Sequence, residues 1–165
     1  MQHVQNRSTT SALVLTAVLI ALATLFTMYT KIPVPGIRGY FNVGDVVIMT
    51  SALLLGRKYG AYIGAIGPAL ADLFLGYAVF VPITFVVKGI EGYLVGTVYN
   101  NKTTTSALVA TIVGGIIIVA GYFIAEYFVF DPGVAIAGIL TNTIQAVMSV
   151  IISMILYAIL RKRLG

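Results

Sequence analysis

Residues 107–128 read ALVATIVGGIIIVAGYFIAEYF, a stretch with one charged side chain, Glu126. A bilayer core about 30 Å thick is crossed by roughly 20 apolar residues in a helix, so this stretch predicts a membrane-spanning helix. The whole chain has the same character, because 59% of its 165 residues are hydrophobic and only 9% are charged. A water-soluble fold would lack polar surface at this composition. We therefore predict an all-α integral membrane protein.

Working outward from this helix, apolar runs alternate with short breaking segments. Four breaking segments stand out: the proline- and glycine-rich loop 31–42, GRKYG at 56–60, NNKTTT at 100–105 and FDPG at 130–133. Four of the other predicted spans cover residues 11–29, 43–55, 61–75 and 134–160. The fifth has Pro82 near its start and reaches Tyr99. The prediction is a single domain over residues 1–165, a compact bundle of six transmembrane helices. A structured outer loop joins the first two helices.

The distribution of cations predicts the orientation in the membrane. With residues 1–10 as a polar cytoplasmic tail, and with the first apolar run retained rather than cleaved as a signal peptide, both termini are cytoplasmic. The inner face then carries seven cations, Arg7, Arg57, Lys58, Lys102, Arg161, Lys162 and Arg163. The outer face carries two, Lys31 and Arg38. This asymmetry fits the positive-inside rule and predicts a multi-pass protein of the cell membrane, in contact with lipid.

Several function classes are disfavoured by composition. The chain has no cysteine and one histidine, His3 in the polar tail, so we expect no metal site and no cysteine nucleophile. The net charge of +5 does not indicate nucleic acid binding, because the cations are scattered between apolar runs. No GxxxxGK[ST] phosphate-binding pattern occurs, so the chain is not expected to hydrolyse ATP itself. We expect no cofactor.

Charged side chains at bilayer depth are the main candidates for a site. They are expensive to insert, so each needs a charged partner or a watery cavity. The candidates are Asp45, Asp72, Lys88, Glu91 and Glu126. Lys88 and Glu91 are three residues apart and share a helix face. They either contact a substrate in one outward-facing cavity or belong to a buried ion pair with Asp72 or Asp45, and spacing leaves both interpretations open.

Amides and aromatic residues extend this candidate site. Asn142 and Gln145 lie at i and i+3, and they either bind a solute or hydrogen-bond between helices. Tyr40 and Phe41, in the loop before Asn42, either stack on a flat ligand ring or anchor the loop at the membrane interface. On the first helix, Ala17 and Ala21 form a small-residue strip, which suits either packing inside the bundle or docking of another helix.

Residues 41–96 resemble the substrate-binding S components of energy-coupling factor (ECF) vitamin transporters. The resemblance lies in FNxGD at 41–45, the GxxxG and ALAD patterns of the third predicted helix, FxxKGxEG around Lys88 and Glu91, and NxxQ at 142–145. It implies a membrane-embedded subunit that binds one vitamin from outside, under its first loop. It also implies partners, a transmembrane coupling subunit and two cytoplasmic ATPases, with Ala17 and Ala21 as the docking surface.

On this resemblance the substrate-binding residues are expected to be Tyr40, Phe41, Asn42, Asp45, Asp72, Lys88, Glu91, Glu126, Asn142 and Gln145. The expected ligand is hydroxymethylpyrimidine or a pyridoxine-like vitamin, with pantothenate or riboflavin as alternatives. Two other classes remain open. An intramembrane enzyme would use Asp72, Glu91 or Glu126 as general acid or base, although no nucleophile motif accompanies them. A purely structural membrane subunit would bind partners but no solute.

Overall fold

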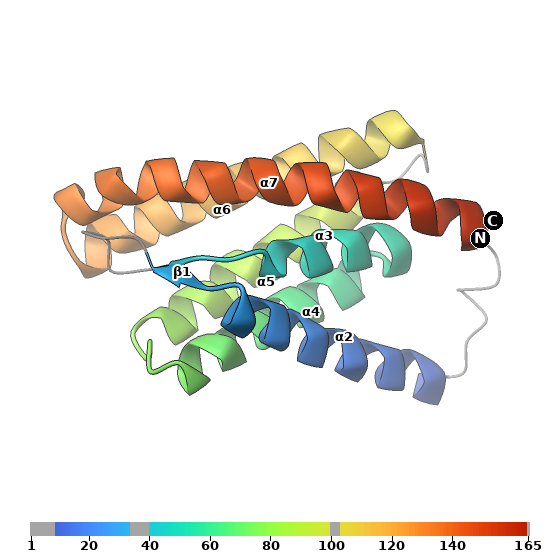
Figure 1. The fold of residues 1–165 in the computed structure, drawn as a ribbon, viewed down its shortest axis with the longest axis horizontal. Helices are drawn as coiled ribbons and strands as arrows, with labels where there is room; N and C mark the ends of the chain where they lie inside the picture. Colours follow the sequence, from blue (N-terminus) through green and yellow to red (C-terminus); the bar gives the residue numbers. More distant parts are fainter. Residues whose placement is uncertain (1–8, 34–39, 100–102, 165) are drawn as a thin grey trace.

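A computed structural model of the chain describes residues 9–33, 40–99 and 103–164. Six helices and two short strands make up the described residues: α2 (Thr9–Tyr29), β1 (Ile32–Pro33), β2 (Tyr40–Phe41), α3 (Gly44–Leu55), α4 (Arg57–Phe74), α5 (Phe80–Val98), α6 (Thr104–Val129) and α7 (Pro132–Leu164). The helices run up and down in one bundle (Figure 1), with α3 in its interior. This confirms the predicted all-helical six-helix fold.

The outside of the bundle is apolar, and its interior holds both hydrophobic and polar side chains. Large hydrophobic side chains such as Leu13, Phe85, Ile116 and Leu140 are exposed on α2, α5, α6 and α7, as expected for surfaces that face lipid. Four helices are long and apolar enough to cross a membrane, with spans at Thr10–Tyr29, Phe80–Val98, Thr104–Val129 and Pro132–Lys162. The 12 residues of α3 rise only about 18 Å, so this helix is surrounded by the others rather than crossing the bilayer alone.

Glycines allow the helices that carry the site to approach closely. A Cβ at Gly64 of α4 would collide with the backbone carbonyl of Lys88 on α5, and one at Gly92 would collide with the carbonyl of Gly60. Gly67 lies against Ala23 of α2 in the same way. Gly60, Gly64 and Gly67, which include the GxxxG pattern of this helix, therefore serve packing inside the bundle.

One connection differs from the sequence prediction. GRKYG does not form a five-residue turn, because α4 begins at Arg57 and only Gly56 lies between it and α3. Gly56 has φ of 90°, a left-handed conformation in which one glycine reverses the chain. The outer loop contains an antiparallel pair, Ile32 with Phe41 and Pro33 with Tyr40.

The two ends of the bundle differ in charge. The start of α2 and the end of α7 lie at the same end (Figure 1), together with Arg57, Lys58, Arg161 and Lys162. Lys31 follows α2 at the opposite end. The cations Arg7, Arg38 and Lys102 and the side chain of Arg163 fall outside the part of the chain that the structure describes. The cytoplasmic location of the first end stays a prediction.

Candidate functional site

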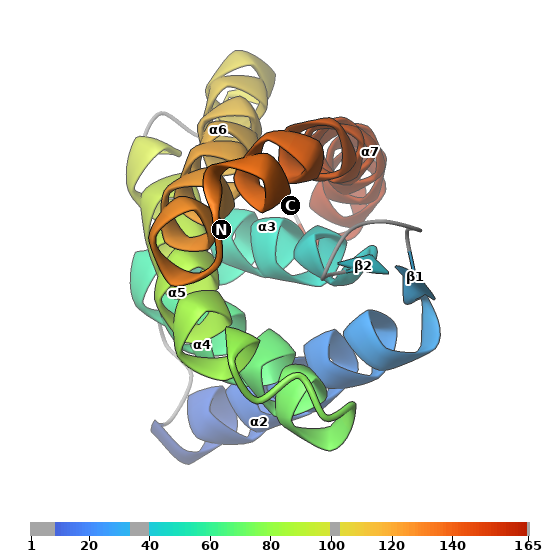
Figure 2. The same ribbon diagram turned by 90° about the vertical axis from the view of Figure 1, so that its left-hand side faces the viewer.

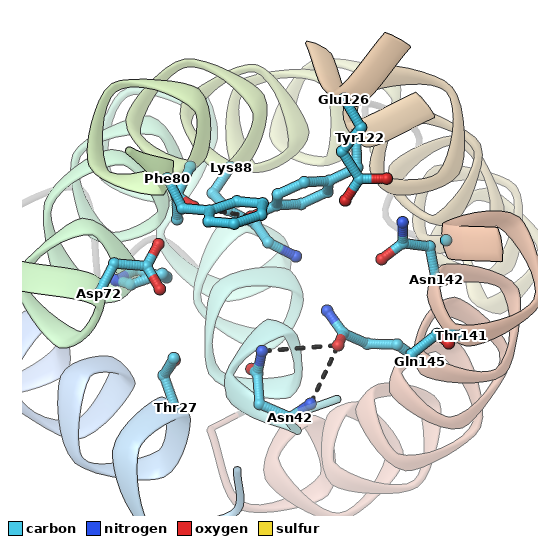
Figure 3. Close-up of a pocket in the computed structure, with 13 residues that line it drawn as sticks. Thr27, Asn42, Asp72, Phe80, Lys88, Tyr122, Glu126, Thr141, Asn142 and Gln145 are labelled. Carbon is cyan, nitrogen blue, oxygen red and sulfur yellow. Dashed lines mark hydrogen bonds between the residues drawn. The ribbon is translucent and has the colours of Figure 1, made fainter. Parts of the chain in front are cut away.

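A cavity of about 40 Å³ lies inside the bundle, toward the end that carries Lys31. It holds a few water molecules at most in this conformation. All six described helices, or the connections between them, contribute side chains to the cavity or to the layer directly beneath it. Figure 2 shows the bundle from this end, and Figure 3 shows the cavity. Its lining consists of Thr27, Asn42, Pro68, Asp72, Phe80, Thr84, Lys88, Tyr122, Glu126, Gly138, Thr141, Asn142 and Gln145.

The floor of the cavity is a buried charge network centred on Lys88. Its ammonium group pairs with Asp45 Oδ1 and lies 3.5 Å from Glu91 Oε2. Lys88 is 1% exposed, and Asp45 and Glu91 are fully buried. An unpaired charge would be unstable at this depth. The ion pair with Asp45 is one of the two arrangements that the sequence left open, yet Lys88 also lines the cavity, so it is available to both roles.

Gln145 connects this network to the start of α3. Its Nε2 donates to Asp45 Oδ2 at 2.7 Å, and its Oε1 accepts from the Asn42 backbone N–H at 3.0 Å. The Asn42 side chain in turn accepts from the Gly44 N–H at 2.8 Å. Both ends of the Gln145 amide are therefore engaged by protein groups. Its partner in the NxxQ pattern, Asn142, points into the cavity from α7 (Figure 3).

Aromatic rings form one wall of the cavity. Phe80 of α5 and Tyr122 of α6 both line it (Figure 3). The Tyr122 hydroxyl is hydrogen-bonded to Thr84 at 2.9 Å, and Lys88 Nζ is 5.4 Å from the Tyr122 ring centroid. These contacts hold the ring in place in the cavity wall.

Two carboxyl groups face the cavity from different sides. Asp72 of α4 lies on one side, and Glu126 of α6 lies on the other, near Asn142 (Figure 3). Glu126 is 4% exposed, and its Oε2 occupies the space that a side chain at Gly138 of α7 would fill. The cavity thus offers hydrogen-bond acceptors on two walls, an amide beside one of them, and a flat aromatic surface.

The structure brings six of the ten expected site residues to this cavity: Asn42, Asp72, Lys88, Glu126, Asn142 and Gln145. Asp45 and Glu91 contact Lys88 beneath the cavity and do not line the cavity, because both lie in the closely packed interior of the bundle. The side chains of Tyr40 and Phe41 fall outside the described part of the chain. Whether these residues bind a ligand remains a proposal.

Sequence reasoning missed several lining residues, notably Thr27, Phe80, Thr84 and Tyr122. A spacing signal existed for three of them. Thr84 and Phe80 precede Lys88 by four and eight residues, and Tyr122 precedes Glu126 by four, so each pair shares a helix face. Gly138 likewise precedes Asn142 by four residues, whereas Thr27 carries no such signal. Pro68 and Thr141 were also missed.

Ala17 and Ala21, the expected docking residues, are both exposed on the outside of α2. Neighbouring Ala23 is fully buried against Gly67. The strip formed by Ala17 and Ala21 is therefore not used for packing within the described bundle.

Known proteins resemble this chain over nearly its whole length. A relative from Pyrococcus woesei, itself uncharacterized, is 41% identical over 145 residues, which is 86% of this chain and 96% of the relative. The thiamine precursor transporter HmpT of Lactococcus lactis is 30% identical over 149 residues, covering 89% of this chain and 83% of HmpT.

Two solved structures share the fold. The S component of a bacterial ECF transporter has a TM-score of 0.78 at 20% identity and covers 96% of this chain and 99% of its own. The biotin S component of an ECF-type ABC transporter has a TM-score of 0.65 at 18% identity, covering 92% and 93%. The family model for the ECF-type riboflavin transporter S component matches residues 7–162. This chain therefore belongs to the family of ECF-type transporter S components.

Proposed function

We propose that the chain is the vitamin-binding subunit of an ECF-type importer and that its ligand is hydroxymethylpyrimidine or a closely similar, pyridoxine-like ring. The observation that carries the proposal is the cavity that Asp72, Glu126 and Asn142 line together with the aromatic residues Phe80 and Tyr122. Amino and hydroxyl substituents on a ring donate hydrogen bonds to such carboxylates, and the ring stacks on Phe80 and Tyr122. The relative HmpT is named as a thiamine precursor transporter, which supports the same ligand class.

The size and charge of the cavity support a small neutral ring over the alternatives. At about 40 Å³, the cavity must widen for any vitamin, but a single six-membered ring demands far less movement than the three fused rings of riboflavin. Pantothenate carries a carboxylate, which needs a cation. Lys88, the cation in the described lining, is already paired with Asp45. Binding pantothenate would therefore compete with that ion pair.

The partners follow from the family. S components act with a transmembrane coupling subunit and two cytoplasmic ATPases, and in this proposal ATP hydrolysis belongs to those chains. The exposed strip Ala17 and Ala21 on α2 is the proposed docking surface, because small side chains let another helix approach closely. The end that carries Arg57 and Arg161 is proposed to face the cytoplasm. Membership of a transporter family sets aside the intramembrane-enzyme alternative.

Calorimetry on the purified chain in detergent, without ATP or partner subunits, tests this proposal. The panel contains hydroxymethylpyrimidine, pyridoxine, pantothenate and riboflavin. We expect hydroxymethylpyrimidine or pyridoxine to bind with micromolar or tighter affinity, and pantothenate and riboflavin to bind more weakly. Tightest binding of riboflavin or pantothenate would overturn the ligand assignment. Folded protein that binds no member of the panel, and that releases no small molecule when denatured for mass spectrometry, would favour a structural subunit.

A further inference from the structure

Two polar groups in the cavity wall lack hydrogen-bond partners among the described residues. They are the hydroxyl of Thr27 on α2 and Oε2 of Glu126 on α6. Thr27 is 1% exposed and Glu126 is 4% exposed, so bulk water does not satisfy them. Buried polar groups in native proteins almost always have partners, and an exception needs an explanation. A ligand that widens the cavity on binding provides one here, because both residues line the cavity.

Several other polar groups of the cavity are hydrogen-bonded or ion-paired to protein side chains. The amide of Gln145 is used at both ends by Asn42 and Asp45, and Lys88 pairs with Asp45. The Tyr122 hydroxyl is bonded to Thr84. These groups hold one another in place, so they support the shape of the cavity. Thr27 and Glu126 keep hydrogen-bonding capacity for a ligand.

Thr27 and Glu126 lie on opposite sides of the cavity (Figure 3). They therefore contact different edges of a ring placed between them. Their chemistry also differs. A carboxylate oxygen accepts a hydrogen bond, which matches an amino N–H, whereas the threonine hydroxyl both donates and accepts, which matches another hydroxyl. A hydroxymethyl arm extends beyond the ring and so reaches a second wall.

We propose that Thr27 and Glu126 determine specificity, with Glu126 accepting from the amino group of the ligand ring and Thr27 hydrogen-bonding to its hydroxymethyl group. This inference rests on the proposed function, because it assigns two edges of the proposed ligand. Thr27 becomes the residue that distinguishes a hydroxymethyl ring from its methyl analogue. Glu126 becomes the residue that distinguishes an amino ring from a ring without that group.

The test crosses variants with ligand analogues in calorimetric titrations of the full chain in detergent. The variants are Thr27→Val, which keeps the side-chain shape, and Glu126→Leu, with Thr27→Ser and Glu126→Gln as conservative controls. The ligands are hydroxymethylpyrimidine, its analogue with methyl in place of hydroxymethyl, and its analogue with hydrogen in place of the amino group. Thermal unfolding of each variant shows that it is folded.

Thr27→Val should weaken binding of hydroxymethylpyrimidine about tenfold, since a neutral hydrogen bond is lost, and should leave binding of the methyl analogue unchanged. Glu126→Leu should weaken binding of hydroxymethylpyrimidine about 10- to 100-fold, because the lost acceptor is a carboxylate. It should leave binding of the analogue without the amino group unchanged. Thr27→Ser should retain wild-type affinity, and Glu126→Gln, which keeps one acceptor oxygen, should be intermediate.

The outcomes separate the inference from the proposed function. If the wild-type chain does not bind hydroxymethylpyrimidine, the proposed ligand is wrong and the inference fails with it. If the wild-type chain binds it, but Thr27→Val weakens both the hydroxymethyl and the methyl compound equally or neither, Thr27 does not read the hydroxyl and the inference alone is overturned. The same holds for Glu126→Leu and the amino group.

Discussion

Replacing Lys88 with methionine should destabilise the protein strongly. Lys88 is buried between Asp45 and Glu91, with its ammonium paired to the first and 3.5 Å from the second. Its removal leaves two carboxyl groups enclosed without their cation. Removing one partner of a buried ion pair costs about 3–5 kcal/mol. Asp45 keeps the 2.7 Å hydrogen bond from Gln145, so we expect a loss of about 3 kcal/mol, near the lower limit.

For a chain of this length, about 3 kcal/mol corresponds to a fall in Tm on the order of 10 °C. Circular dichroism in detergent measures the Tm. It is chosen over tryptophan fluorescence because the chain has no tryptophan. Adding Asp45→Asn to Lys88→Met should recover part of the loss, because the second change removes the stranded charge. Lys58→Met, at an exposed position on α4, should change the free energy of unfolding by less than about 0.5 kcal/mol. Strictly additive effects of the two buried substitutions, or a Tm of Lys88→Met equal to that of Lys58→Met, would refute this reasoning.

Two further predictions concern packing and assembly. Gly64→Ala should destabilise the chain by about 1–3 kcal/mol, because the new Cβ meets the Lys88 carbonyl and pushes α4 away from α5. The loss should appear as a lower Tm. An unchanged Tm would show that the two helices are not closely packed there. The double variant Ala17→Leu, Ala21→Leu should leave vitamin binding unchanged but reduce co-purification with the coupling subunit. The control Ala120→Leu, on the exposed face of α6, should leave co-purification unchanged. Intact co-purification of the double variant would exclude this strip as the docking surface.

The fold was largely predictable because membrane helices need long apolar runs. Residues 107–128 and the breakers around them predicted α6 and its neighbours to within a few residues. The start of α4 at Arg57 differs from the prediction because the cations Arg57 and Lys58 favour a loop by composition. Gly56 completes the turn alone, and long cationic side chains at a helix end extend toward the interface.

The site was only partly predictable, for a related reason. A charge such as Lys88 stands out in an apolar helix, because its burial demands a partner. Thr27 does not stand out, and Phe80 does so only through its spacing from Lys88, since hydroxyl and aromatic residues are common throughout such helices. Their place in the cavity depends on which helix faces pack together, and this is set by glycine contacts between distant segments. The position of Glu91 beneath the cavity likewise depends on that packing.

The most direct test of the account is the affinity of a chain whose cavity is filled. Gly138→Leu places a side chain where Glu126 Oε2 now lies, whereas Ala120→Leu makes a similar change in size in an apolar groove between α6 and α7. Equilibrium dialysis with labelled hydroxymethylpyrimidine should give wild-type affinity for Ala120→Leu and more than about tenfold weaker binding for Gly138→Leu. Wild-type affinity in a folded Gly138→Leu chain would show that the ligand binds elsewhere.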